Sequence, residues 1–338
     1  MMTATMDRLL VTKVKARPIL SDRAGNGITA GRLLLALTVI VSHSFALTGQ
    51  VEPLVAETGQ TSLGFLAVLG FFGLSGWLLA QSRERNSLAA FVRNRVLRIY
   101  PAYWLALLFG ASVALAYGST ATEVVAYVAT NLTILLPGAS SGSAFGGYTV
   151  NGSLWTLGVE VACYLALAVT PARWVRPLAL GLVMVFCALW VLPAMRGAET
   201  MLFIAFAAGA SRVTVSPWAA GVAAVVLFAL ALTPLAVVAT ALAALGMARL
   251  PWHWTRDLSY GTYVFAYPVS KMLSGVVTEP LVMAALTMVV VLPLAYLSWT
   301  FIEAPALRLR LTDLRHDHAS GEVVAGIATH HIAKDVAH

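Results

Sequence analysis

Long apolar runs separated by short polar segments make up most of this sequence. A helix rises about 1.5 Å per residue, so about 20 apolar residues cross a hydrocarbon layer of about 30 Å. The pattern predicts an all-α fold, a polytopic transmembrane bundle of about ten helices. The predicted spans are residues 28–48, 62–81, 101–117, 153–170, 177–193, 200–212, 217–232, 234–249, 258–275 and 281–301.

The stretch 121–136 is ambiguous, because it is apolar but short and contains Glu123. Positive charge helps to decide, since Lys and Arg gather on the cytoplasmic side of membrane proteins. If this stretch stays outside, both termini are cytoplasmic, and 19 of the 22 Lys and Arg residues lie in cytoplasmic segments. Counting it as a crossing would move Arg173 and Arg176 outside. The bias therefore favours ten spans, although the sixth to eighth are short enough for an error of one pair.

Composition excludes a soluble protein, because 59% of the residues are hydrophobic and only 11% are charged, against roughly 25% charged in soluble domains. The formal charge of +7 lies mostly in the predicted cytoplasmic segments, which indicates a lipid bilayer rather than nucleic acid as the partner. We expect a multi-pass protein of the bacterial inner (cytoplasmic) membrane. Its expected parts are a basic cytoplasmic tail (1–26), a transmembrane domain (27–306) and a polar cytoplasmic C-terminal tail (307–338).

Three ionisable residues inside the predicted spans are candidates for chemistry, because a charge in hydrocarbon costs several kcal/mol unless it is paired or faces water. Arg32 and His43 are eleven residues apart, which places them within roughly 20° on one helix face and about 16 Å apart. Glu160 is expected at a depth similar to that of His43, where a carboxylate would orient an imidazole acting as a general base. Structural roles are the alternatives: a helix-to-helix hydrogen bond for His43, snorkelling for Arg32, and a structural partner for Glu160.

Five arginines between residues 83 and 98 alternate with apolar side chains up to Pro101. This pattern predicts an amphipathic helix lying on the membrane. The arginines would either bind anionic lipid and set the orientation, or form a phosphate site, since guanidinium groups bind phosphate oxygens bidentately. A CoA thioester, which is made in the cytosol and carries several phosphates, would suit such a site.

Metal and nucleotide chemistry have little support. No Asp lies inside a predicted span, and there is no phosphate-binding glycine loop. A Gly-x-Ser-x-Gly elbow, which joins a strand to a helix, is not expected in an all-α fold. The C-terminal tail holds several histidines without cysteines or regular spacing, so we expect no metal site. Cys163 and Cys187 are expected to be packed thiols.

Six short blocks follow one another along residues 27–306. They are Arg32 and His43 with ten residues between them, Phe71-Phe72-Gly73-Leu74-Ser75-Gly76-Trp77, Arg95-Val96-Leu97-Arg98-Ile99-Tyr100-Pro101, Trp155-Thr156-Leu157-Gly158-Val159-Glu160, Ser259-Tyr260, and Phe301-Ile302-Glu303-Ala304-Pro305. In these blocks and their order the chain resembles the integral-membrane acyltransferase-3 family, whose members modify carbohydrates, lipids and antibiotics. One departure is that Ala266-Tyr267 precedes Pro268, where many members have a histidine.

The resemblance implies an O-acyltransferase that uses a cytosolic acyl-CoA donor, often acetyl-CoA, with no permanently bound cofactor. It assigns Arg32 to positioning the donor, Arg95 and Arg98 to its phosphates, His43 to deprotonating an acceptor hydroxyl, and Glu160 to holding the imidazole or the acceptor. Supporting residues would be Ser75, Trp155, Tyr260 and Glu303. Direct transfer and a transient acyl-histidine both stay open.

The expected acceptor is an extracytoplasmic saccharide or other glycan-like molecule, such as a glycolipid. The alternative function is a transporter or flippase of a polar lipid or saccharide, which the number of spans and the buried charges would also fit. Transporters commonly show paired broken helices in two related halves, and no internal repeat is evident here.

Overall fold

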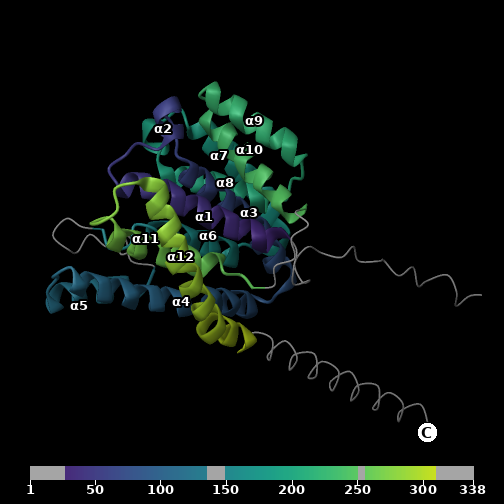
Figure 1. The fold of residues 1–338 in the computed structure, drawn as a ribbon. Coiled ribbons are helices and arrows are strands. Elements are labelled where there is room, and N and C mark those ends of the chain that lie inside the picture. Colours follow the sequence, from purple (N-terminus) through teal and green to yellow (C-terminus); the bar gives the residue numbers. More distant parts are fainter. Residues whose placement is uncertain (1–26, 135–148, 250–255, 310–338) are drawn as a thin grey trace, which may run out of the picture.

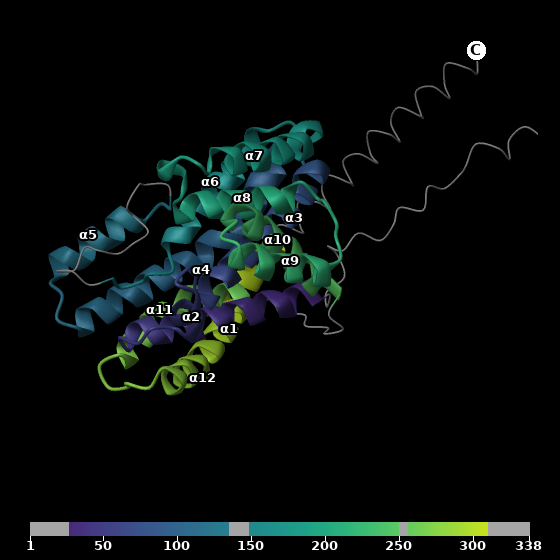
Figure 2. The same cartoon turned by 90° about the horizontal axis from the view of Figure 1, so that it is seen from above.

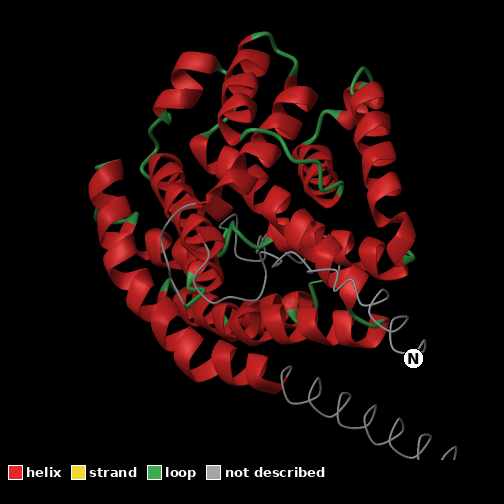
Figure 3. Ribbon diagram, turned by 90° about the vertical axis from the view of Figure 1, so that its right-hand side faces the viewer, coloured by secondary structure: helices red, strands yellow, loops and turns green. Residues whose placement is uncertain are grey.

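The structure, a computed structural model, describes residues 27–134, 149–249 and 256–309, and all regular elements in these ranges are helices (Figure 3). The predicted tail 1–26 and most of the tail 307–338 lie outside the described residues. The α-helices are α1 (Gly27–Leu47), α2 (Pro53–Thr58), α3 (Leu63–Arg85), α4 (Leu88–Ala116), α5 (Ala121–Asn131), α6 (Trp155–Val169), α7 (Val175–Leu189), α8 (Ala198–Ala210), α9 (Pro217–Ala229), α10 (Thr233–Ala244), α11 (Ser259–Leu273) and α12 (Pro280–Ser298). The short elements are three 3₁₀ turns, η1 (Ala172–Trp174), η2 (Pro193–Met195) and η3 (Leu245–Arg249), and a π-helical turn, η4 (Trp299–Glu303).

A helix lies over each of the ten predicted spans, so the helical fold class and the general positions of the elements are confirmed. Five described helical stretches are long and apolar enough to cross a membrane, and α6, α8, α9 and α10 are apolar but shorter. The number of crossings and the cytoplasmic placement of both termini stay predictions. The five long stretches are residues 27–47, 63–85, 88–116, 172–189 and 280–309.

The helices are arranged around α3, which packs against α1, α8 and α10 (Figure 1). On its other side α1 packs against α11 and α12, while α7 packs against α8. The view from above shows the resulting order, with α7 and α12 at opposite edges and α1 and α3 between them (Figure 2). The helix that carries Arg32 and His43 therefore lies inside the bundle, and its two ends can each form a site.

Glycines allow α3 and α8 to approach closely. A Cβ at Gly76 would lie 2.1 Å from the Phe206 carbonyl oxygen, and one at Gly209 would lie 1.9 Å from the Gly73 carbonyl oxygen. Small residues of this kind let membrane helices pack backbone against backbone. Ser75 is flanked by these contacts but faces the opposite direction, into the pocket described below.

The arginine-rich segment was predicted to be a separate helix ending at Pro101, and this prediction was wrong. Arg83 and Arg85 lie in the last turn of α3, whereas Arg93, Arg95 and Arg98 share one helix, α4, with the third span, and Pro101 lies inside that helix. Proline removes a backbone hydrogen bond, but membrane helices tolerate it where neighbouring side chains contact the backbone groups nearby. Close to Pro101, the Tyr260 hydroxyl of α11 donates to the Ile99 carbonyl at 3.0 Å.

The ambiguous stretch forms α5, which has 11 residues and is therefore only about 16 Å long. Thr120 caps its start, and the Glu123 side chain accepts from the Thr120 backbone N–H. The helix runs back along α4, so that the Tyr103 hydroxyl donates to the Asn131 carbonyl at 2.6 Å. By its length alone α5 does not cross a bilayer.

Candidate functional site

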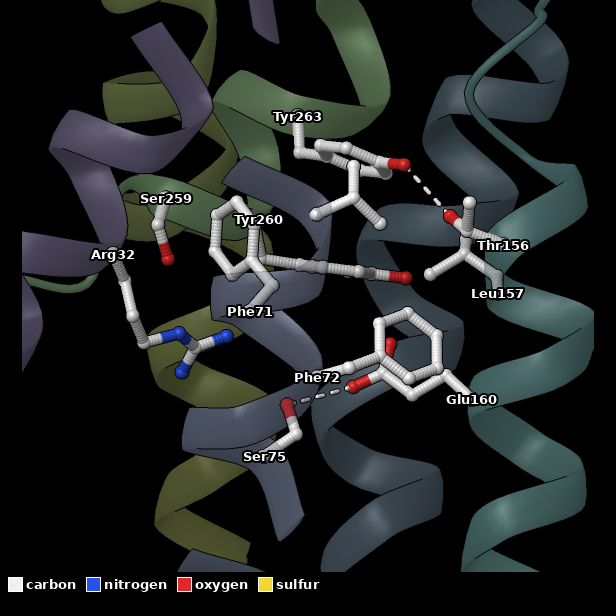
Figure 4. Close-up of a pocket in the computed structure, with 11 residues that line it drawn as sticks. Arg32, Phe71, Phe72, Ser75, Thr156, Leu157, Glu160, Ser259, Tyr260 and Tyr263 are labelled. Carbon is white, nitrogen blue, oxygen red and sulfur yellow. Dashed lines mark hydrogen bonds between the residues drawn. The ribbon is translucent and has the colours of Figure 1, made fainter. Parts of the chain in front are cut away.

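A pocket opens between α1, α3, α6 and the start of α11 (Figure 4). Its cavity volume is about 40 Å³, and most of its wall is aromatic or aliphatic with a few polar groups. Such walls are typical of small-molecule sites, in which a few polar groups orient a ligand. The lining residues are Arg32, Val68, Phe71, Phe72, Ser75, Thr156, Leu157, Glu160, Ser259, Tyr260 and Tyr263.

The pocket brings together four residues that the sequence singled out: Arg32, Ser75, Glu160 and Tyr260. Ser75 donates to the Glu160 carboxylate at 3.3 Å, and the Tyr164 hydroxyl donates to the same carboxylate oxygen at 2.5 Å. Arg32 lies across the pocket with its guanidinium 6.0 Å from the centre of the Phe71 ring. The pocket therefore offers a cation, a carboxylate and a hydroxyl from three different helices (Figure 4).

Asp257, in the loop before α11, joins Arg32 to Arg98. Its carboxylate accepts from Arg32 at 3.0 Å and also pairs with Arg98. Burial opposes ionisation of this group, but the charges of the two arginines, together with hydrogen bonds from Ser259, lower the pKa of Asp257 to about 2. The carboxylate is therefore ionised at any physiological pH.

Arg98 is held on its other side by Glu303 at 3.2 Å. Its guanidinium also lies over the rings of Tyr260 and Trp299, at 5.6 and 5.7 Å from their centres. Glu303 is 1% exposed, belongs to the π-helical turn η4, and accepts from Ser298 at 3.1 Å. Two carboxylates therefore balance the charge of Arg98, and its expected role at the donor phosphates stays a prediction.

His43 lies at the opposite end of α1, beside Tyr267. The two rings meet edge to face with their centres 5.5 Å apart. Glu160 lies in a different place from the predicted one, because its carboxylate accepts hydrogen bonds from Ser75 and Tyr164 in the pocket and not from His43.

Three contacts between α11 and the region around the start of α6 explain this difference. The loop before α6 enters the bundle, where Gly152 packs against Tyr267 and Thr156 bonds the Tyr263 hydroxyl at 2.7 Å. The side chain of Asn151 donates to the Val264 carbonyl at 2.9 Å. The helix α6 thus begins deep in the bundle. Glu160 lies one helical turn after Thr156, on the wall of the pocket that Arg32 also lines.

The carboxylate that does lie within electrostatic range of His43 is Glu52. It is 6% exposed and follows α1 in the chain. One oxygen accepts from the Leu63 N–H at 2.6 Å, and the other pairs with the Ser42 hydroxyl. Sequence reasoning missed Glu52, because it lies between the predicted spans 28–48 and 62–81, and nothing in its spacing indicated that this loop folds back.

Asp257 was missed for a related reason, since it lies just outside the predicted span 258–275, and only charges inside a span were expected to be buried. Among the remaining predicted residues, Arg95 lies within electrostatic range of Tyr164. Trp155 begins α6, packs against the core and is not part of the pocket wall.

In the part of the chain that is described, no group of three His, Cys, Asp or Glu residues could hold a metal ion.

Comparison with known proteins agrees with these features. An O-acetyl transferase of Shigella phage Sf6 is 33% identical over 162 residues, a match that covers 44% of this chain and 46% of the phage protein. The chain thus spans about half the length of that relative. No solved structure matches the chain. The model of a family described as an acyltransferase domain matches residues 26–300, which include every residue of the pocket, and the chain therefore belongs to this acyltransferase-3 family.

Proposed function

We propose that the chain is an O-acyltransferase that moves an acyl group, acetyl in the simplest case, from cytosolic acyl-CoA to a hydroxyl of an extracytoplasmic saccharide or other glycan-like acceptor. Family membership and the phage O-acetyl transferase support acyl transfer. The observation that carries the two-sided arrangement is the position of a cation and an imidazole at the two ends of α1. The protein would lie in the bacterial inner membrane, with the Arg32 end toward the cytoplasm.

In the proposed reaction His43 takes the proton of the acceptor hydroxyl while the oxygen attacks the thioester carbonyl. The carbon–sulfur bond breaks, the carbon–oxygen bond of the ester forms, and the CoA thiolate receives the proton. A general base of this kind contributes about 10²- to 10⁴-fold to a rate. An acyl-histidine that the acceptor then attacks would give the same balance in two steps.

The pocket supplies the donor end of this scheme. Arg32 would hold the donor, with Arg95 near its phosphates, while Ser75 and Glu160 would hydrogen-bond its amide or acyl portion. The cavity is narrow at about 40 Å³, so donor entry requires side chains such as Phe71 and Tyr263 to move. Because Tyr263 is one α11 turn from Tyr267, and Tyr267 contacts His43, such a movement would open the pocket toward the imidazole.

The test is to measure acetyl groups on envelope glycans by mass spectrometry in cells that carry the wild-type chain or His43→Ala. Wild-type cells should gain acetyl esters, and the variant should lose them by about 100-fold or more at an equal amount of membrane protein. Unchanged acetylation by the variant would reject the proposed role of His43. A gain of transported saccharide without any new ester would instead favour the transporter.

A further inference from the structure

We propose that Asp257 is a positioning residue that holds the Arg32 guanidinium on the wall of the donor pocket. This inference rests on the proposed function, because it assigns Arg32 to the donor. Nothing in the sequence motifs points to Asp257, and the argument comes from the ion pairs around it.

The ion pairs form one connected series across four separate parts of the fold. Glu303 of η4 pairs with Arg98 of α4, Arg98 pairs with Asp257 in the loop before α11, and Asp257 pairs with Arg32 of α1. Three of these side chains are at most 19% exposed, and Arg32 is 20% exposed. Charges in such surroundings interact more strongly than on an open surface, because water screens them less.

Arg98 is fixed more firmly than Arg32. Two carboxylates balance its charge, and the rings of Tyr260 and Trp299 lie against it. Arg98 therefore provides a rigid anchor for Asp257, and it acts on the pocket through that carboxylate rather than by contact with the donor.

Arg32, by contrast, makes a single hydrogen bond to a described residue, the one to Asp257, and one ring contact with Phe71. A guanidinium has five N–H donors, so most of them stay available to a ligand in the pocket. A free arginine side chain has many rotamers, and fixing them in advance lowers the entropy lost when a ligand binds. Asp257 thus orients the Arg32 guanidinium and leaves most of its N–H donors available to a ligand.

A purely structural role is the competing explanation, because Asp257 also accepts hydrogen bonds from the Ser259 N–H at 3.3 Å and from the Ser259 hydroxyl at the start of α11. These bonds use Oδ1, whereas the arginines bind Oδ2. The substitution Asp257→Asn preserves the first oxygen and removes the charge. It therefore separates the two roles.

Glu84 offers a matched control. Its carboxylate also bridges two arginines, Arg176 at 3.1 Å and Arg212 at 2.5 Å, but none of the three lines the pocket. The substitution Glu84→Gln removes a two-arginine bridge of the same kind elsewhere in the molecule.

The experiment measures binding of radiolabelled acetyl-CoA to the full-length chain purified in detergent, alongside its thermal unfolding. Asp257→Asn should weaken binding about tenfold or more, which corresponds to about 1.4 kcal/mol of binding free energy or more. Asp257→Glu should recover much of the loss, and Glu84→Gln should bind as the wild type does. Since Asp257 acts through Arg32, Asp257→Asn should cause no further loss in an Arg32→Gln background.

Wild-type protein that does not bind acetyl-CoA would overturn the proposed donor. If the wild type and Asp257→Asn bind acetyl-CoA equally well, the positioning role alone is overturned. The positioning role would also be overturned if the double variant Arg32→Gln/Asp257→Asn lost affinity for acetyl-CoA by the product of the two single losses. It would equally be overturned if Asp257→Glu lost as much affinity as Asp257→Asn. If Asp257→Asn does not accumulate, Arg98→Lys serves as a second variant, because it keeps the positive charge but loses the planar guanidinium that holds Asp257. This variant should bind acetyl-CoA more weakly although Arg32 is intact. Normal binding by Arg98→Lys would reject the inference.

Discussion

The two ends of α1 differ in how tightly their charged groups are held. At one end Arg32 belongs to a series of four paired charges reinforced by aromatic rings. At the other end His43 contacts, among the described residues, the ring of Tyr267 and lies within electrostatic range of the Glu52 carboxylate. A group that binds a ligand benefits from fixed geometry, whereas a group that exchanges a proton needs access to the acceptor. The contrast indicates that binding and proton transfer are divided between the two ends.

The largest expected effect separates these two functions directly. His43→Ala should bind acetyl-CoA within about twofold of the wild type but lose transfer by about 100-fold or more. Arg32→Gln should lose binding as well as transfer. Equilibrium binding and single-turnover acetyl transfer, measured on the same preparations, check this. If His43→Ala also abolishes donor binding, the division between the two ends is wrong.

A smaller effect is expected at Glu52, beside the imidazole. Glu52→Gln should slow transfer about tenfold, because a negative charge near a histidine stabilises its protonated form, while acetyl-CoA binding stays unchanged. Ser42→Ala is the control, since it removes one hydrogen bond to Glu52 but keeps the charge. Transfer rates that fall equally in both variants would show that the hydrogen bond between Ser42 and Glu52 matters, rather than the negative charge of Glu52.

The smallest effect on chemistry should come from the contact between α3 and α8, next to Ser75. Gly76→Ala places a methyl group 2.1 Å from the Phe206 carbonyl oxygen, and overpacking of this kind costs about 1–3 kcal/mol. The thermal unfolding temperature in detergent should fall. Donor binding should weaken only as far as the neighbouring Ser75 is shifted. Gly181→Ala in α7 has open space and should be neutral or slightly stabilising, because alanine favours helix over glycine. Equal unfolding temperatures would mean that the two helices separate easily.

Sequence alone determined the fold class, because long apolar runs with few charges can satisfy their backbone hydrogen bonds in a membrane only as helices or closed barrels. It also placed Arg32 and His43 on one face of one helix, since helical geometry relates residues eleven apart without any tertiary information. The blocks that carry Ser75, Glu160 and Tyr260 were found in the sequence too, and all three residues line the pocket with Arg32.

Only the tertiary structure decided which charges meet. Glu160 was expected beside His43, but α6 starts deep in the bundle, so Glu160 lies in the pocket with Arg32. Asp257 and Glu52 reach their partners because a loop at each end of α1 folds against the bundle. The physical reason is that helix geometry fixes relations within one segment, whereas the depth at which a helix begins and the path of a loop depend on packing against distant segments.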